Sequence, residues 1–357
     1  MKIAVLVSGG VDSSVALHLL KQQGHDLTAF YLKIWLEDEL SFLGDCPWEQ
    51  DLTYVRAVCE QLDVPLRVIS LQKEYHDQVV SYTVNEVKQG RTPNPDILCN
   101  QRIKFGMFWS KVGQEFDKVA TGHYAQVIDR DGNAHLYCAP DEIKDQTYFL
   151  SHLSQEQLRK ALFPIGHLTK AQVRELAERY DLLNKHRKDS QGICFLGKLK
   201  FRDFIAHYLG THRGDLIEYE TGIKQGEHDG FWFYTIGQRQ GIGLAGGPWY
   251  VVAKSSSKNI IYISKNYYAP EKDRDTFFME GCNWIAGEPP KKKTFEIKIR
   301  HGKHAYACTI DFLPEGRVKV QLNARDQGIA PGQFAVLYDK NECLGCGIIT
   351  DSPATIT

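Results

Sequence analysis

The feature that most constrains this chain is its amino end, where an apolar run is followed by a glycine turn and a helical pattern. The apolar run spans residues 3–7, the turn reads Ser8-Gly9-Gly10-Val11-Asp12-Ser13-Ser14, and Val15 and Leu19 continue a helical face. A strand, a turn and a helix start in this order present unpaired backbone NH groups and the positive end of a helix dipole to an anion. The chain is therefore expected to bind phosphate here.

The residue types in this turn agree with phosphate binding. Gly9 and Gly10 let the backbone approach phosphate oxygens and adopt φ values that a Cβ would resist. Serine hydroxyls add donors, and Asp12 can hold a Mg²⁺ ion against the phosphates. The turn has no Gly-Lys-Ser/Thr ending, which excludes a P-loop. It resembles the pyrophosphate loop of enzymes that split ATP into AMP and pyrophosphate; the alternative is an ordinary strand-to-helix turn with serine caps.

Length, cysteine content and charge bound the class of protein. A chain of 357 residues is expected to form two or three domains. No apolar segment approaches the roughly 20 residues of a membrane span, and no signal peptide is evident. We therefore expect a cytoplasmic protein with no membrane partner. In that compartment its nine cysteines are expected to be thiols. A net charge of −1 means that nucleic acid would bind through local patches. The basic runs 185–188 and 291–293 are candidates, although such runs are also common on solvated surfaces.

Strand-like segments alternate with helical patterns over the first half of the chain. The predicted strands after the first are Leu27 to Trp35, Leu66 to Leu71 and Lys118 to Thr121. Such an alternation predicts an α/β fold with a parallel sheet covered on both faces and ligands at the carboxyl ends of its strands. Two further helices are predicted by the capping boxes Ser154 with Gln157 and Thr169 with Gln172.

After Gly210 the residue pattern becomes typical of short β-strands. We expect an ATP-binding α/β domain with a helical extension over residues 1–205, a small β-rich middle domain over 206–275, and a C-terminal β-barrel over 276–357. Phe231 to Tyr234 is predicted to be a strand that packs in a core, with base stacking as the alternative, and Pro314 to Gly316 to be a hairpin turn. The barrel is expected to be removable without unfolding the α/β domain.

Four cysteines stand in informative settings. Cys99 follows two prolines near a predicted helix start, and Cys194 lies in a glycine-bearing loop after the basic run 185–188. Both settings favour a thiolate with a lowered pKa, but burial as small hydrophobic residues explains the two cysteines equally well. Cys343 and Cys346 have the spacing of a zinc half-site, but because no second pair is evident we favour core packing and predict no metal site.

Six motifs, in order along the chain, resemble those of the bacterial tRNA-specific 2-thiouridylases. They are Ser8 to Ser14, Arg91 to Asn100, Ala120 to Tyr124, Lys144 to Leu150, Asp189 to Gly197 and Phe233 to Arg239. The resemblance covers essentially the whole chain. It implies a sheet of the adenine nucleotide alpha hydrolase (PP-loop ATPase) type, use of ATP and Mg²⁺, and 2-thiolation of uridine 34, the wobble position, in the tRNAs for lysine, glutamate and glutamine.

The same resemblance implies a role for individual residues. It implies that ATP is bound by Leu6, Val7, Ser8, Gly9, Gly10, Val11, Asp12, Ser13, Leu32 and Gly122. The target base would contact Asn94, Pro95 and Asp96, and the catalytic thiols would be those of Cys99 and Cys194. The implied tRNA contacts are His123, Lys144, Asp145, Gln146, Arg300, His301 and Gln333. In the implied reaction AMP is transferred to the uridine C2 oxygen, Cys194 carries sulfur as a persulfide received from a donor protein, and Cys99 closes a disulfide with Cys194. The implied partners are that donor and the anticodon stem-loop of tRNA, with no DNA.

Two other functions remain open at this point. An amide ligase that adenylates its substrate would use the same ATP loop but needs no pair of cysteines. A nucleotide-dependent RNA-binding module would perform no catalysis and would tolerate replacement of either cysteine. Nucleoside analysis of tRNA treated with the protein, ATP and a sulfur source distinguishes the three functions.

Overall fold

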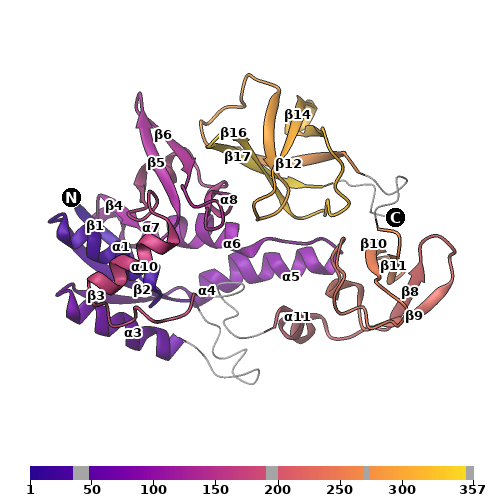
Figure 1. Ribbon diagram of the computed structural model, residues 1–357, viewed down its shortest axis with the longest axis horizontal. Coiled ribbons are helices and arrows are strands. Elements are labelled where there is room, and N and C mark those ends of the chain that lie inside the picture. The colour runs from indigo at the N-terminus through magenta and orange to yellow at the C-terminus, as the bar shows by residue number, and fades with distance from the viewer. Residues whose placement is uncertain (35–47, 190–199, 268–273, 351–357) are drawn as a thin grey trace.

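The computed structural model describes residues 1–34, 48–189, 200–267 and 274–350, which form three domains (Figure 1). The first domain lies on the left of the view, the C-terminal domain at the upper right and the middle domain at the lower right. No helix within the described ranges has the length and apolar character needed to cross a membrane.

The first domain is built on a five-stranded parallel sheet, which confirms the predicted α/β fold. The strand order is β3-β2-β1-β4-β7, and every neighbouring pair is parallel. The strands are β1 (Lys2–Leu6), β2 (Asp26–Lys33), β3 (Leu66–Ser70), β4 (Lys118–Ala120) and β7 (Ala161–Leu162). Because β1 is central and ends directly before the glycine turn, that turn lies at the carboxyl edge of the sheet, where ligands bind in such folds.

Alternate residues of β1 pack on opposite faces of this sheet. Ala4 and Leu6 belong to one hydrophobic cluster, whereas Ile3 and Val5 belong to another that also includes side chains of the flanking helices α1 and α3. The helices of the first domain and its extension are α1 (Val11–Gln22), α3 (Trp48–Gln61), α4 (Gln72–Tyr75), α5 (Ser81–Lys88), α6 (Pro95–Leu98), α7 (Phe108–Val112), α8 (Thr147–Leu150), α9 (Gln155–Lys160) and α10 (Lys170–Arg179). Two π-helical segments, His76–Val80 and Cys99–Met107, continue α4 and α6.

Both predicted capping boxes are present. The Ser154 hydroxyl accepts from the Gln157 NH at the start of α9, and the Thr169 hydroxyl accepts from the Gln172 NH at the start of α10. Each reciprocal pair satisfies two NH groups at a helix start. The second box fixes the start of α10, which carries Lys170 and several other residues of the candidate site.

The middle domain contains a mixed four-stranded sheet that follows α11 (Phe201–Leu209). The strands, in the order β10-β11-β8-β9, are β10 (Tyr250–Ser255), β11 (Ile260–Ser264), β8 (Gly214–Glu218) and β9 (Lys224–His228). Helix α11 packs against α5, which in Figure 1 extends from the first domain towards the middle domain. The two domains are therefore joined by helix packing as well as by the chain.

The strand predicted over Phe231 to Tyr234 is wrong, although the prediction of core packing is confirmed. Residues Phe231–Phe233 form a 3-10 turn. Phe231 and Tyr234 are buried in the middle-domain core, whereas Trp232 and Phe233 pack against both that core and the core of the first domain. A tight turn points successive aromatic side chains in three directions, which a strand with two faces cannot do.

The C-terminal domain is a closed barrel of six strands, as predicted. Its order is β12-β15-β14-β13-β16-β17, and β12 pairs with β17 to close it. The strands are β12 (Thr276–Trp284), β13 (Thr294–Lys298), β14 (Tyr306–Phe312), β15 (Val318–Leu322), β16 (Phe334–Asp339) and β17 (Glu342–Ile349). The predicted turn at Pro314–Gly316 joins β14 to β15, with φ values of 61° at Glu315 and 74° at Gly316.

The barrel shares a strand pairing and a hydrophobic cluster with the first domain, contacts that the sequence did not predict. The hairpin of β5 (Ala125–Arg130) and β6 (Asn133–Cys138) comes from the first domain, yet β6 pairs with β17 of the barrel. Barrel residues such as Phe334, Val336 and Tyr338 belong to the same hydrophobic cluster as the first-domain core. One cluster across two domains means that separation exposes apolar surface on both sides.

Candidate active site

The turn between β1 and α1 leaves the backbone NH groups of residues 9–13 without partners among the described residues. Gly10 is the N-cap of α1, and no side chain caps this helix end. Across the part of the chain that the structure describes, no group accepts a hydrogen bond from the NH groups of residues 9–13. These donors and the helix dipole together favour an anion at this position.

The two glycines of the turn serve different purposes. Gly9 has a φ of +78°, as the sequence predicts, whereas Gly10 has a φ of −75°, which any residue can adopt. At Gly9 a Cβ would also lie 2.6 Å from Nη1 of Arg187 and 2.7 Å from the carbonyl oxygen of Asp51. Gly9 is thus required by its φ value and by close packing, and Gly10 is not required by its φ value.

Serine side chains and one asparagine determine the shape of the turn. The hydroxyls of Ser13 and Ser14 each donate to the Gly10 carbonyl at 3.1 Å. Asn184, which is buried, donates through Nδ2 to the Gly9 carbonyl at 2.8 Å and to the Ser14 hydroxyl at 2.9 Å. Sequence reasoning missed Asn184 because nothing in the local sequence indicates a contact with a turn 175 residues away.

Asp12 lies at the start of α1 and is held by two side chains. Its Oδ1 accepts from Lys170 Nζ at 2.6 Å and from the Tyr124 hydroxyl at 2.9 Å, and its Oδ2 has no partner among the described residues. Burial and the neighbouring Asp12 raise the pKa of Tyr124, so this phenol remains a donor. A carboxylate oxygen without a partner beside the turn fits a Mg²⁺ ion that accompanies a nucleotide, because Mg²⁺ binds few protein ligands besides phosphates and water.

A cluster of cations joins Asp12 to Asp189. Lys170 Nζ lies 2.7 Å from Asp189 Oδ1. The same carboxylate forms ion pairs with Lys144 at 2.8 Å and with Arg174 at 2.5 Å. Burial alone would raise the pKa of Asp189, but hydrogen bonds from Lys144 and Lys170 outweigh it and hold the pKa well below its usual range. Asp189 directly precedes residues 190–199, so Cys194 lies outside the described residues.

Cys99 is buried inside a helix, so of the two alternatives left open by the sequence, burial as a small hydrophobic residue is confirmed and a lowered pKa is wrong for this conformation. It follows α6 at the start of the π-helical segment, and its exposed fraction is 1%. Burial raises the pKa of Cys99 to about 11; the charge of Lys104 opposes this shift and that of Asp96 adds to it. The helix begins four residues earlier, at Pro95, so the favourable dipole end is distant and desolvation dominates.

The segment expected to meet the target base lies between the first domain and the barrel. Asn94 accepts from the Ile97 NH at 3.4 Å, so Asn94, Pro95 and Asp96 form the start of α6. Gln333 of the barrel donates to the Thr92 carbonyl at 2.9 Å and to the Pro93 carbonyl at 3.3 Å. Two positions 240 residues apart are thereby brought together, with Gln333 positioning the backbone that leads to Asn94.

Gly122 and His123 follow β4 at the same edge of the sheet as the turn. A Cβ at Gly122 would lie 2.7 Å from the Ser13 nitrogen, so glycine permits this loop to contact the start of α1. His123 Nδ1 lies 2.6 Å from the Thr121 hydroxyl. Burial, assisted by the charge of Lys104, lowers the pKa of His123 well below its usual value, so the ring is neutral.

The remaining residues expected at the nucleotide are apolar side chains of β1, β2, the turn and α1. Leu6 and Val7 are buried at the end of β1, and Val11 is buried at the start of α1. Leu32, near the end of β2, is partly buried against the first hydrophobic cluster. All four lie next to the carboxyl edge of the sheet, where an adenosine could contact them.

The residues expected to contact tRNA fall into two groups. Asp145 is buried, where it accepts from the Ala139 NH at 3.1 Å and from the Thr147 hydroxyl at 2.8 Å. Gln146 accepts from the Tyr124 NH at 3.0 Å, and Lys144 is paired with Asp189 as described above. The side chains of Asp145 and Gln146 therefore organise the protein interior, and of the three only Lys144 presents a charge near the site.

Arg300 and His301 lie exposed on the barrel. Arg300 forms an ion pair with Asp326, and the His301 ring packs on Phe149 with 4.5 Å between centroids. His301 Nε2 also lies 3.4 Å from the Asp145 carbonyl oxygen. The structure thus brings this pair next to the 144–146 segment, although 156 residues separate Asp145 from His301.

Cys343 and Cys346 pack in the core, as expected. Both are buried thiols of β17 within the first hydrophobic cluster. Burial raises the pKa of each, so both remain protonated. Within the described ranges no three His, Cys, Asp or Glu side chains are grouped so that they could hold a metal ion.

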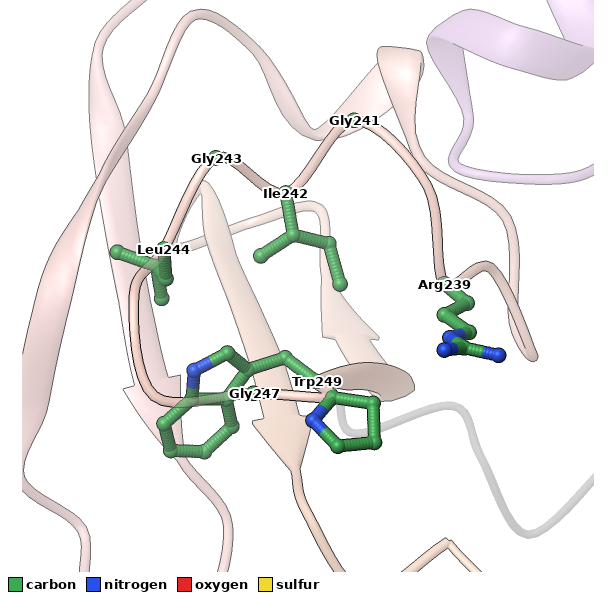
Figure 2. A pocket seen from close by; sticks show the side chains of 8 residues that line it. Arg239, Gly241, Ile242, Gly243, Leu244, Gly247 and Trp249 are labelled. Atoms are coloured by element: carbon green, nitrogen blue, oxygen red, sulfur yellow. The ribbon is translucent and has the colours of Figure 1, made fainter.

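A hollow of about 400 Å³ lies in the middle domain under a glycine-rich loop. Figure 2 shows Ile242 and Leu244 directed towards the Trp249 ring, with Arg239 at the other end of the loop. Lys265 Nζ lies 4.6 Å from the centroid of the Trp249 ring. The Trp249 ring is buried in the middle-domain core, and Arg239 is the charged residue among those that line the hollow.

Comparison with protein families gives three consecutive matches. Residues 1–198 match the tRNA methyl transferase HUP domain, residues 202–265 the tRNA methyl transferase PRC-barrel domain, and residues 274–349 the aminomethyltransferase beta-barrel domain. The matches follow the three domains of the structure in order.

Curated relatives are similar over the full length. The tRNA-specific 2-thiouridylase MnmA of Parabacteroides distasonis is 47% identical, over 98% of this chain and 99% of that protein. The tRNA-specific 2-thiouridylase MnmA 1 of Bacteroides thetaiotaomicron is 45% identical, over 98% of this chain and all of that protein. Among solved structures, a 4-thiouridine synthetase in complex with RNA and ATP aligns with 56% of this chain and 46% of that chain at 15% identity, with a TM-score of 0.33.

Proposed function

The chain belongs to the family of tRNA-specific 2-thiouridylases, and we propose that it uses ATP to replace the C2 oxygen of uridine 34 with sulfur in the tRNAs for lysine, glutamate and glutamine. The observation that carries this proposal is the full-length similarity, 47% over 98% of the chain, to a tRNA-specific 2-thiouridylase. The NH-lined turn with Asp12 beside it supports ATP as the activating substrate, with Mg²⁺ held by Asp12 and the phosphates.

The first step activates the base. The uridine C2 oxygen attacks the α-phosphorus of ATP, a C2–O–AMP bond forms, and pyrophosphate leaves into the turn. Residues 9–13 offer backbone NH donors at the position where negative charge develops on the leaving pyrophosphate. Lys170, which donates a hydrogen bond to Asp12, adds a positive charge next to these donors. The oxygen, once esterified, can depart as AMP.

The second step transfers sulfur. The terminal sulfur of a Cys194 persulfide attacks C2 and AMP leaves; the Cys99 thiolate then attacks Sγ of Cys194, so that the S–S bond breaks and the sulfur remains on C2. The two cysteines are left as a disulfide, which an external reductant must cleave with two electrons before the next turnover. In the alternative route the Cys99 thiolate attacks Sγ of the Cys194 persulfide first, so that the same disulfide forms and hydrogen sulfide leaves; hydrogen sulfide then attacks C2 and AMP leaves.

This reaction requires Cys99 to leave its present environment. Its thiol is buried and protonated, whereas an attacking sulfur must be an exposed thiolate. We propose that binding of tRNA at α6 uncovers it, because Asn94, Pro95 and Asp96 at the start of that helix are the residues proposed to receive the base. The protein partners are then a persulfide donor and the anticodon stem-loop of tRNA, and we place the reaction in the cytoplasm.

The test is a reconstituted reaction with unmodified tRNA, Mg-ATP, a persulfide donor and a reductant. We expect 2-thiouridine in the digested nucleosides, with AMP and pyrophosphate formed in equal amounts. ADP as the nucleotide product would contradict the adenylation step. The Cys194→Ser variant should release pyrophosphate once and keep AMP bonded to the tRNA, with no thiouridine formed; full thiolation by this variant would contradict the cysteine mechanism.

A further inference from the structure

Arg187 lies directly on the candidate nucleotide turn, although it stands 178 positions after Gly9 in the chain. A Cβ at Gly9 would be 2.6 Å from Arg187 Nη1, so the guanidinium is the nearest side chain to that glycine. The Asp51 carbonyl oxygen, in the first turn of α3, would lie 2.7 Å from the same Cβ. Gly9 is thus packed closely against both α3 and the segment that ends at Asp189.

The position of Arg187 is fixed by its own backbone and by its side-chain stem. Its NH donates to the Asn184 carbonyl at 2.9 Å, and its carbonyl accepts from Arg174 Nη1 at 2.8 Å. Its guanidinium stacks on Tyr54 at 4.8 Å from the ring centroid. Since Asn184 itself holds the Gly9 carbonyl, Arg187 and the turn belong to one connected assembly.

The guanidinium has a donor that no protein group uses. Nη2 forms an ion pair with Asp51, whereas Nη1 is buried and has no hydrogen-bond partner in the described part of the chain. A buried donor without an acceptor is unfavourable, more so when it carries charge. The planar fork of arginine matches phosphate oxygens, which can bind two of its NH groups at once.

We propose that Arg187 binds the β and γ phosphates of ATP and the pyrophosphate released from it. The turn lacks the lysine of a P-loop, and Arg187 supplies a cation at that end of the turn from a distant part of the chain. The inference rests on the proposed function for the identity of the nucleotide. In this proposal Arg187 contacts the leaving group at Gly9, which precedes Gly10 in the turn. Lys170 instead contacts Asp12, which follows Gly10.

The test measures binding of magnesium pyrophosphate and of AMP by calorimetry to the full-length protein and three variants. We expect Arg187→Ala to weaken pyrophosphate binding by about tenfold or more and Arg187→Lys by a smaller factor, because lysine keeps the charge but not the fork. AMP lacks the β and γ phosphates, so its affinity should be unchanged in both variants. Lys188→Ala is the matched control, since Lys188 is the exposed neighbour in the same basic run.

Two results would overturn the inference. Pyrophosphate affinity of Arg187→Ala within twofold of the parent would show that the guanidinium does not contact it. An equal loss for AMP and pyrophosphate would show that Arg187 only maintains the turn, and Arg187→Lys repeats this comparison if Arg187→Ala does not fold. Thiolation is assayed in parallel: a parent protein that binds pyrophosphate through Arg187 but forms no thiouridine would refute the proposed function and leave this inference standing.

Discussion

At the scale of single residues, Lys170 joins the two parts of the candidate site. Its ammonium group contacts Asp12 at 2.6 Å and Asp189 at 2.7 Å, with 15% of the side chain exposed. Asp12 belongs to the turn that is proposed to hold pyrophosphate, and Asp189 is the last described residue before the segment that contains Cys194. Lys170 thereby bridges the two carboxylates, and together with Lys144 and Arg174 on Asp189 it reduces their repulsion of each other and of any phosphate.

Replacing this cation should therefore damage function more than stability. We expect Lys170→Met to slow thiolation by at least about 100-fold, because Asp12 would lose the cation that pairs with it beside the phosphates. The free energy of unfolding should fall by roughly 1–3 kcal/mol. Lys111→Met is the control, since Lys111 forms an exposed pair with Glu74 at 2.6 Å, so it should change stability by under about 1 kcal/mol and thiolation not at all. Equal rates for both variants would contradict the role of Lys170.

The raised pKa of Cys99 predicts how its reactivity depends on pH. With a pKa of about 11 the thiol is protonated through the physiological range, and the thiolate fraction grows as pH rises towards that value. Alkylation of Cys99 by iodoacetamide, followed by peptide mass spectrometry, should be slow at pH 7 and accelerate about tenfold per pH unit up to pH 9. Binding of tRNA with ATP should accelerate it at constant pH. A plateau below pH 8 in the free protein would show a thiol of ordinary or lowered pKa.

At the scale of secondary structure, α10 acts as the support for the cations of the site. Its first residue is Lys170, and Arg174 lies one turn later on the same face. The Thr169 capping box and a hydrogen bond from the Lys170 NH to Asp141 at 2.9 Å fix where the helix begins. A shift of this start by one residue would rotate both cations away from Asp12 and Asp189.

The two capping boxes provide a matched pair of variants. Thr169→Ala and Ser154→Ala each remove a helix cap and should each lower the free energy of unfolding by about 1 kcal/mol. Only Thr169→Ala should also weaken ATP binding, because α9 carries none of the residues that surround the turn. Calorimetric titration with ATP and chemical denaturation measure the two effects separately. Equal ATP affinities would show that the cap does not position Lys170.

The glycine-rich loop of the middle domain is a second element with an expected role. Arg239 is exposed and has no ion-pair partner within the described ranges. If the loop contacts tRNA phosphates, Arg239→Ala should weaken tRNA binding severalfold and reduce the slope of log affinity against log salt by about 0.7–0.9. ATP affinity should not change, because the hollow in Figure 2 lies in another domain. An unchanged salt slope would exclude a phosphate contact by Arg239.

At the scale of the whole molecule, the barrel completes the first domain. The β5–β6 hairpin pairs with β17, and Phe334 and Tyr338 share a cluster with first-domain residues such as Phe108. Gln333 also holds the backbone ahead of Asn94. The proposed base-binding segment is therefore built by residues from both ends of the chain.

Removal of the barrel should consequently unfold more than the barrel. A chain that ends at residue 275 would expose the apolar side of the shared cluster and leave the edge of β6 without its partner. We expect this fragment to aggregate, or to show no cooperative unfolding transition and no ATP binding. A soluble fragment that binds ATP as tightly as the full chain would show that the first domain is stable alone.

The sequence by itself determined those features that depend on neighbouring residues. The parallel strands, the turn at 8–14, the capping boxes and the short strands of the barrel follow from local periodicity and turn chemistry, so each could be predicted. The resemblance of the motifs, and not periodicity, indicated which residues to examine for tRNA and sulfur chemistry. It could not show whether each side chain faces a ligand or, as with Asp145, the protein interior.

Only the tertiary structure decided the environment of each group. Helix position predicted a lowered pKa for Cys99, but desolvation by residues distant in the chain raises it. The contacts of Lys170 with Asp12, of Asn184 with Gly9 and of Arg187 with Asp51 each span more than 130 residues and leave no local pattern. The free energy of a charge or a thiol depends on what surrounds it in space, and local sequence specifies only its nearest neighbours along the chain.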